Sequence, residues 1–196
     1  MVFLILKLLW ERVFGTDYID IGNEAAGGRL DIAICNAGGG VGSPEETRAS
    51  IVEEDLVGIV LARNLTGTIN TCRAVAAPMK VQRSGKIITI VSQAGHRIES
   101  NGGYTHCGAA KAAVTKYTQY LARDLGPFDI TANCVAPGYI STVRLAPLLN
   151  AMGDTQLENV PLGRYGTPED CAGVIEFLAS NLSDYVTGAI IPVDGG

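Results

Sequence analysis

Short apolar runs that end in glycine, proline or small polar residues recur along the chain. They are LDIAICNA (30–37), KIITIVS (86–92), ITANCVA (130–136) and AIIPVD (189–194). These runs are dense in β-branched residues, and most of them lack the strict alternation of a half-exposed strand. The pattern predicts a buried strand over each run, followed by a tight turn.

Between these runs the sequence changes to helical stretches with recognisable start and stop signals. Ser43 and Pro44 suit an N-cap and a first helical turn, so a helix is predicted to begin there. Further helices are predicted over 70–82, over 104–126, which a glycine and a proline close, and over 168–180, which begins at a proline.

Buried strands that alternate with helices predict a doubly wound, mostly parallel α/β sheet. In such sheets the ligand crevice lies at the carboxyl ends of the strands. The polar, glycine-containing segments NAGGG (36–40), SQAG (92–95) and PGYIST (137–142) all follow predicted strands. Their shared position predicts a functional site at this edge.

Composition narrows the class of protein. In 196 residues, 47% are hydrophobic and 18% charged, which indicates one globular domain without repeats or linkers. The net charge of −5 and the lack of a basic run argue against nucleic-acid or membrane partners. Five scattered cysteines without a C-x-x-C motif indicate reduced thiols and a cytoplasmic protein, and two histidines give no metal-ligand spacing.

The amino end, MVFLILKLLW, is apolar but too short to span a bilayer, which takes roughly 20 apolar residues. Lys7 interrupts it, and a signal peptide would need leading basic residues and a cleavage site. We interpret it as a short helix or strand packed on the domain.

In this order, seven segments resemble the short-chain dehydrogenase/reductase family. They are LDIAICNAG, RNLTG, IITIVSQAG, CGAAKAAV, ITANCVAPGYIST, GRYGTPEDCA and YVTGAIIPVDGG. The resemblance covers roughly 30–196. It implies a Rossmann-type fold, NAD or NADP as cofactor, hydride transfer between a small-molecule secondary alcohol and a ketone, and a homodimer or homotetramer.

The resemblance also implies the cofactor-binding residues. The turn after the first predicted strand would pack beside the adenine ribose, where small residues allow close approach. Lys111 would bond the nicotinamide ribose, and a segment after 136 would flank the nicotinamide, followed by a variable substrate lid. The remaining implied contacts are Asn36, Ala37, Gly38, Pro137, Gly138 and Thr142.

Three residues match the family's catalytic set. Asn64 would help hold a water in a proton relay, Ser92 would bond the substrate oxygen, and Lys111 would lower the proton affinity of a neighbouring phenol. Structural explanations stay open for two of them: Asn64 as a helix-interior asparagine, and Ser92 as a turn former.

The fourth catalytic position holds Cys107 instead of the family's tyrosine, four residues before Lys111. A thiol is more acidic than a phenol, at about 8.5 against about 10. It also ends roughly 4 Å nearer the backbone, and proton transfer needs contact at ~2.6–3.2 Å or one bridging water. We therefore expect a small buried thiol without a direct role. By helical register, Tyr104 is not expected to replace it.

The sequence also lacks G-x-G-x-x-G and G-x-x-x-G-x-G, the turns that cradle a pyrophosphate. We therefore divide the chain into an atypical segment, 1–29, and a Rossmann domain, 30–196, that is incomplete at its amino end, and we expect weak cofactor binding. An exposed sheet edge invites pairing, so residues 2–8 are predicted to fill the gap beside the strand at 30–37.

Three interpretations remain open. The protein is an oxidoreductase of this family with weak or absent activity, or a non-catalytic binding or oligomerising module. Alternatively, the sequence has lost its beginning and gained Cys107 by substitution.

Overall fold

The computed structural model describes residues 3–6, 29–98, 102–143, 145–146, 149 and 157–196. Their core is a five-stranded parallel sheet in which each strand pairs with the next along the chain. The strands are β1 (Phe3–Leu6), β2 (Ile32–Cys35), β3 (Gly85–Ile90), β4 (Ile130–Pro137) and β5 (Ile190–Val193).

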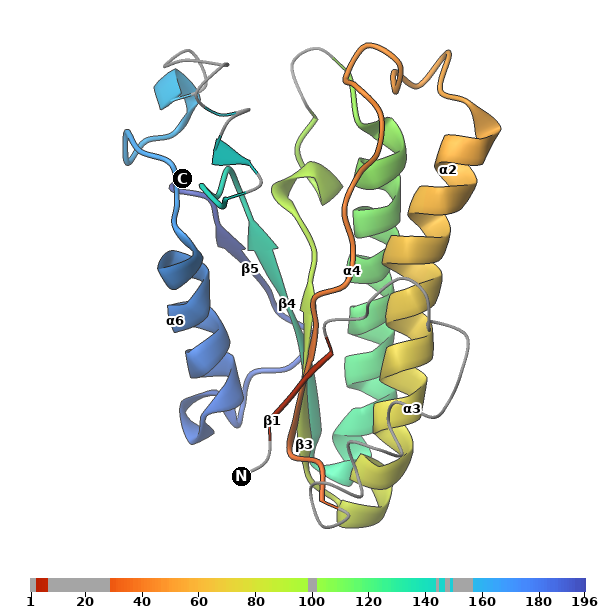
Figure 1. The fold of residues 1–196 in the computed structure, drawn as a ribbon. Coiled ribbons are helices and arrows are strands. Elements are labelled where there is room, and N and C mark those ends of the chain that lie inside the picture. The colour runs from red at the N-terminus through yellow and green to blue at the C-terminus, as the bar shows by residue number, and fades with distance from the viewer. Residues whose placement is uncertain (1–2, 7–28, 99–101, 144, 147–148, 150–156) are drawn as a thin grey trace.

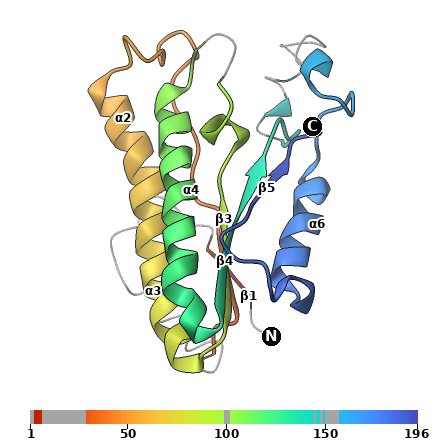
Figure 2. The ribbon, with the colours of Figure 1, turned by 180° about the vertical axis from the view of Figure 1, so that it is seen from behind.

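Helices cover both faces of this sheet (Figures 1 and 2). On one face, α2 (Glu54–Leu61), a π-helical turn η2 (Ala62–Thr66) and α3 (Gly67–Gln82) run on continuously beside α4 (Thr105–Leu125). On the other face lies α6 (Pro168–Ala179). The short 3₁₀ turns are η3 (Gln93–Gly95), η4 (Gly126–Phe128) and η6 (Asn181–Ser183).

A separate apolar cluster lies on each face of the sheet. Ile87 and Ala132 join α3 and α4 in one cluster, whereas Ile88 and Val135 join α6 in the other. Neighbouring residues of a strand point to opposite faces, so β3 and β4 must be apolar at consecutive positions. Each fully buried isoleucine or valine contributes about 1.5–3 kcal/mol, and the continuous apolar runs follow from this arrangement.

The Rossmann-type α/β fold and its strands and long helices are confirmed. Residues 2–8 were predicted to pair with the strand at 30–37. The register confirms this for Phe3–Leu6, with Phe3 opposite Ile32 and Leu6 opposite Cys35, whereas residues 2, 7 and 8 lie outside the described residues. The boundary between 1–29 and 30–196 stays a prediction, because residues 7–28 lie outside the described residues.

The helix predicted from Ser43 is wrong. Ser43 and Glu46 cap each other's backbone N–H groups, but the helix does not continue. The Thr47 hydroxyl donates to the Ser43 carbonyl at 2.7 Å, which is the acceptor that the Thr47 N–H would use in an α-helix. The same hydroxyl accepts from Tyr104 N–H at 2.9 Å, so packing against the start of α4 overrides the capping signal. The first long helix begins at Glu54.

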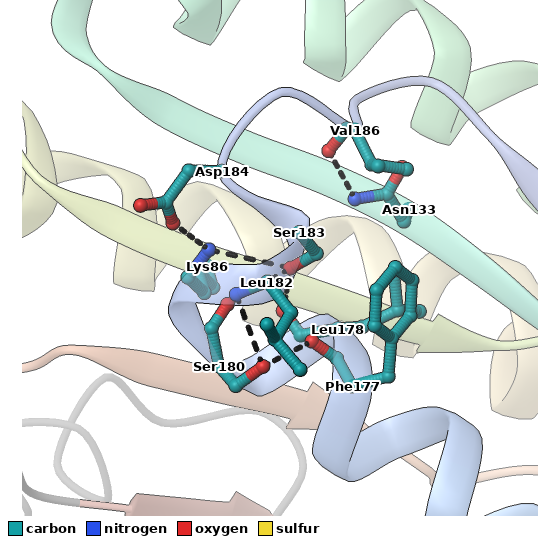
Figure 3. A network of polar contacts seen from close by, with 9 residues as sticks. All are labelled: Lys86, Asn133, Phe177, Leu178, Ser180, Leu182, Ser183, Asp184 and Val186. Carbon is teal, nitrogen blue, oxygen red and sulfur yellow. Dashed lines mark hydrogen bonds and ion pairs between the residues drawn. The ribbon is translucent and has the colours of Figure 1, made fainter.

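Polar contacts fasten the amino ends of the strands, at the edge opposite the predicted site (Figure 3). Lys86 pairs with Asp184 at 2.7 Å. The buried amide of Asn133 donates to the Val186 carbonyl at 2.8 Å and accepts from Ala189 N–H at 3.0 Å. These bonds hold η6 and the segment before β5 against β3 and β4.

Among the described residues, no helix is both long and apolar enough to cross a bilayer. No group of three or more histidine, cysteine or acidic side chains in the same residues is arranged to hold a metal ion.

Candidate active site at the carboxyl edge of the sheet

Because β2, β3 and β4 run parallel, the segments that follow them emerge at one edge of the sheet. Contacts show that they converge there. A Cβ placed on Gly38 would lie 3.0 Å from Lys111 Nζ, and one on Gly138 would lie 3.1 Å from Gln93 Oε1. The predicted convergence of these segments is therefore present in the structure.

Lys111 lies at the centre of this edge. It points from α4 toward β3, is 8% exposed, and its Nζ donates to the Ile90 carbonyl at 2.8 Å. Burial lowers the pKa of its ammonium group, while the thiols of Cys107 and Cys134 act in the opposite direction. An ammonium has three N–H donors, and Ile90 takes one of them.

Asn64 lies in the π-helical turn and is fully buried. Its Nδ2 donates to the carbonyls of Gly39, at 3.0 Å, and Val60, at 2.9 Å, and its Oδ1 accepts from Gly39 N–H at 3.0 Å. Both amide donors are thus engaged. The side chain fastens the 36–40 turn to the helix, as expected for a buried amide.

The contact between Asn64 and the 36–40 turn explains why residue 38 is a glycine. A Cβ on Gly38 would lie 2.5 Å from Asn64 Oδ1, which no real side chain tolerates. The close neighbours at Gly38 are Asn64 and Lys111, so a small residue is required by the protein's own packing. Asn36, at the start of this turn, is exposed, and Ala37 is partly buried.

Ser92 follows β3 in extended backbone, two residues after the carbonyl that holds Lys111. Its Oγ accepts from Ala94 N–H at 3.2 Å and so caps η3. That bond uses a lone pair of the hydroxyl and not its hydrogen. Ser92 therefore stabilises the turn, and its O–H group remains available to donate a hydrogen bond.

Cys107 lies in the first turn of α4, one helical turn before Lys111. The side chain is half-buried against the 36–40 turn, because a Cβ on Gly40 would lie 3.9 Å from its Sγ. The thiol that was expected to be buried is thus partly exposed. Burial raises the pKa of the Cys107 thiol, and the Lys111 charge lowers it in part.

Tyr104 lies outside the helix that the sequence predicted to include it. Its backbone is left-handed, with φ 54° and ψ 28°, and α4 begins at Thr105. The buried Thr47 fixes this conformation through the bond to Tyr104 N–H. A Cβ on Gly40 would lie 3.6 Å from the Tyr104 ring. Sequence reasoning missed Thr47, since one threonine in a turn gives no periodic signal.

The segment after β4 packs against the carboxyl end of the chain. Gly138 N–H donates to the Val193 carbonyl at 2.9 Å, and a Cβ on Gly138 would lie 2.6 Å from Asp194 Cβ. Pro137 ends β4, and Thr142 Oγ1 accepts from the N–H of residue 145. Much of the predicted substrate lid after Thr142 lies outside the described residues.

A second set of contacts at this edge of the sheet was not predicted from the sequence. Arg97, just past η3, donates to the Gly196 carbonyl at 3.0 Å and lies 3.5 Å from Asp194 Oδ2. The pair ties the segment after Ser92 to the end of β5.

The residues present fit one end of a dinucleotide. Lys111 offers a buried cation held at the end of β3, and Gly38 brings backbone close to its Nζ. Gly138 brings the segment after β4 close to Gln93, in the turn that follows Ser92. A glycine-rich turn that leads into a helix, the usual pyrophosphate site, is not found before β2 in the described residues. The nicotinamide ribose end of the cofactor fits this edge.

Comparison with known proteins agrees with this geometry. The family model described as enoyl-(acyl carrier protein) reductase matches residues 21–196. The cyclohexanol dehydrogenase of Rhodococcus sp. (strain TK6) is 84% identical over 170 residues, which cover 86% of this chain and 63% of that protein. A 3-oxoacyl-(acyl-carrier-protein) reductase of Chlamydia muridarum is 39% identical over 172 residues, 86% of this chain and 66% of the relative.

A solved structure with bound NAD, a 3-oxoacyl-(acyl-carrier protein) reductase from Brucella melitensis, superposes with a TM-score of 0.80 at 33% identity. The match covers 94% of this chain and 68% of that one. The chain thus spans a little under two thirds of the length of the curated relatives and contains the part that carries the candidate site. The chain belongs to the short-chain dehydrogenase/reductase family of oxidoreductases, which use a nicotinamide cofactor.

Proposed function

We propose that the protein interconverts a small secondary alcohol and its ketone with NAD or NADP, and that a cyclic alcohol is the substrate class. The 84% identical relative, named a cyclohexanol dehydrogenase, supports this substrate class. The observation that carries the proposal is the buried Lys111, whose Nζ donates to the carbonyl of Ile90, two residues before Ser92 at the end of β3.

In this proposal the chain's own groups orient the substrate. When bound, the cofactor supplies or accepts the hydride. The Ser92 hydroxyl donates its remaining hydrogen to the carbonyl oxygen. The Lys111 ammonium stabilises negative charge near that oxygen and holds the cofactor ribose. Pro137, Gly138 and Thr142 flank the reacting ring, and the turn Asn36–Gly38 borders the adenine ribose side.

Proton transfer is the weak step of this site. The Cys107 pKa is raised by burial, so the thiol stays protonated at neutral pH. Its Sγ ends close to α4, beside Gly40. A misplacement of about 1 Å in a catalytic group costs ~10²-fold in rate. Asn64 donates its two amide hydrogens to the carbonyls of Gly39 and Val60, so its side chain has no remaining donor for a proton relay. We therefore propose weak turnover.

Restoring the phenol tests this proposal. Cys107→Tyr should raise turnover of cyclohexanol at least ~10²-fold over the natural chain, whereas the matched variant Cys107→Phe should give no gain, since only the hydroxyl distinguishes them. Cofactor binding is measured first, by NADH and NADPH fluorescence, where we expect a weak signal for this chain. The variants are therefore also compared in a chain with a relative's glycine-rich unit placed before Leu30.

Two outcomes would contradict the proposal. Equal turnover of the natural chain and Cys107→Tyr would show that the cysteine does not limit the reaction. Tight cofactor binding without turnover of any alcohol or ketone by Cys107→Tyr would exclude the reaction itself.

A second candidate function, a binding or oligomerising module without catalysis, is supported by an open groove between α3 and α4. Tyr117, Tyr120, Arg73, Lys80 and Asp124 line it, and Tyr120 is 71% exposed. We propose that this face joins two copies of the chain, as a homodimer or within a homotetramer.

A further inference from the structure

Two thiols that have no role in the proposed reaction face each other behind the candidate site. Cys35 ends β2 and Cys72 lies in α3, and their sulfur atoms are 3.7 Å apart. Both side chains are buried, at 4% and 0% exposure. Cys35 directly precedes the turn that begins at Asn36.

Three side-chain contacts hold the segment from Leu30 to Gly39, which contains β2, against the continuous helix formed by η2 and α3, and the thiol pair is the middle one. At the lower end, Gln82 donates to the Leu30 carbonyl at 2.8 Å and accepts from Leu30 N–H at 2.7 Å. At the upper end, the amide of Asn64 makes two bonds to the backbone of Gly39.

The spacing of these contacts fits helix and strand geometry. From Cys72 to Gln82 the helix rises about 15 Å, and from Cys35 back to Leu30 an extended chain spans about 17 Å. On the other side of the thiol pair, η2 continues directly into α3, and the Asn64 amide holds Gly39, four residues after Cys35. The helix and the strand therefore stay in register, and the two sulfur atoms are held face to face.

We propose that Cys35 and Cys72 form an oxidation site that closes to a disulfide when a hydroperoxide is supplied. A disulfide needs an S–S distance of about 2.05 Å, so the sulfurs must approach by about 1.7 Å. Rotation of the two short side chains provides most of this movement, because the contacts fix the backbones on either side.

The chemical step balances with the hydroperoxide as oxidant. One thiolate attacks the peroxide oxygen, the O–O bond breaks, and water or an alcohol leaves with a sulfenic acid on the protein. The second sulfur then displaces hydroxide from that sulfenic acid, which forms the S–S bond and releases water. Two electrons pass from the sulfurs to the peroxide, and the two thiol protons end in the products.

A third buried thiol is the natural competitor. Cys134 lies close enough to affect the pKa of Cys72, but its Sγ accepts a hydrogen bond from Thr89 at 3.2 Å. It belongs to another apolar cluster, with Val91 and Val114. Cys35 is therefore the partner that the geometry selects for Cys72.

The closure should be slow at neutral pH. The hydrogen bond with Cys35 raises the pKa of the Cys72 thiol well above its ordinary value, and burial adds to the effect. Only the thiolate attacks the oxidant, so the rate should rise about tenfold per pH unit until this pKa is reached. The oxidant must also enter through local opening, since neither sulfur is at the surface.

Peptide mapping tests the proposal directly. Trypsin places the cysteines on separate peptides, with Cys35 in 30–48, Cys72 in 64–73, Cys107 in 98–111 and Cys134 in 124–144. The natural chain is treated with hydrogen peroxide near pH 7 and near pH 9, and free thiols are alkylated in denaturant before digestion. We expect peptides 30–48 and 64–73 to appear joined, two hydrogens lighter than their sum, faster at the higher pH, and separable by a reductant.

Matched variants and stability give further readouts. Cys72→Ala should abolish the joined peptide, whereas Cys134→Ala and Cys107→Ala should keep it. The oxidised chain should melt on the order of 5 °C higher, because the bond closes a loop of 37 residues. If Cys72→Ala does not fold, the map of the natural chain decides alone.

Three results would contradict the proposed Cys35–Cys72 disulfide. Cys35 and Cys72 recovered as free thiols after Cys107 has been oxidised would exclude the site. So would Cys72 joined to Cys134, or sulfinic acids at 35 and 72 without a link. None of these results depends on whether the chain oxidises an alcohol.

Discussion

At the scale of single residues, opposing effects set the chemistry of Cys107. The half-buried position beside Gly40 raises its pKa, and the Lys111 charge one helical turn away lowers it in part. Burial is the larger effect. The thiol that replaces the family's tyrosine is therefore a poor nucleophile and a poor base at neutral pH, although a free thiol is more acidic than a phenol.

The alkylation rate of Cys107 measures this balance. With iodoacetamide, followed on peptide 98–111, the rate should reach half its maximum at a higher pH than for a free thiol, because burial raises the pKa of Cys107 and only the thiolate reacts. Lys111→Met should move the midpoint further upward by removing the charge that favours the thiolate. A midpoint below about 8.5, the value of a free thiol, would contradict the dominance of burial.

At the scale of elements, the start of α6 braces the segment after β4. Thr167 and Asp170 form a capping box, and Asp170 also binds Arg164 through two bonds of 2.7 and 2.9 Å. Just before this cap, Gly166 makes backbone bonds to Tyr139 and Ser141, next to the predicted cofactor segment. The cap of α6 therefore holds a wall of the candidate site.

Acid should weaken this brace. Bonds from Arg164 and from the Thr167 N–H hold the pKa of Asp170 well below its usual range. Because the pKa of Asp170 is lower in the folded than in the unfolded protein, its ionised carboxylate stabilises the fold. This stabilisation is complete at pH values above the unfolded-state pKa, near 3.9, and is lost as the pH falls through the folded-state pKa. Asp170→Asn should thus lower the melting temperature at pH 7, and the difference from the natural chain should shrink below pH 4.

Circular dichroism melts at several pH values check this prediction, with Glu169→Gln as the control that removes a charge from the same helical turn. Because Asp170 and Arg164 are both at least partly exposed to solvent, salt should reduce the difference. A difference that persists unchanged at pH 2 would show that the carboxylate charge is not the cause.

The elements that sequence patterns could predict are those whose signals agree with their tertiary contacts. The strands at 86–92 and 130–136 are mostly apolar at consecutive positions because both faces of the sheet are covered. The end of α4 is marked by Gly126 and Pro127. Ser43 carried a correct cap signal, yet Thr47 redirected the backbone through a contact with a residue far along the chain. Tyr104 left the helix for the same reason. No local pattern encodes such contacts.

The candidate site shows the same division. The strand ends that carry Ser92 and Gly138 could be placed because parallel strands share an edge. Asn64 and Lys111 could be named from the family's motifs. The contact between Arg97 and Asp194 could not be predicted from the sequence, since it depends on how the end of β5 approaches η3.

At the scale of the whole molecule, the groove between α3 and α4 is the surface we expect to meet a second copy. Tyr120→Glu should convert a dimer to a monomer, because it removes an exposed aromatic ring from the contact and requires a carboxylate to be desolvated between the two copies. Tyr185→Glu is the matched control, since Tyr185 is fully exposed near the opposite edge of the sheet. Sedimentation velocity distinguishes the forms, and a natural chain that is already monomeric would contradict the assembly.

The buried amide of Asn133 has a consequence for how the last strand finds its place. Along β5 the side chains are only partly covered, so slipping by two residues would sacrifice little apolar contact. The amide accepts from one backbone group and donates to another just before that strand, and no shifted alignment preserves both bonds. Asn133 therefore selects one register of β5 against β4. Because Asp194 directly follows β5, this register also sets the position of Asp194 beside Gly138.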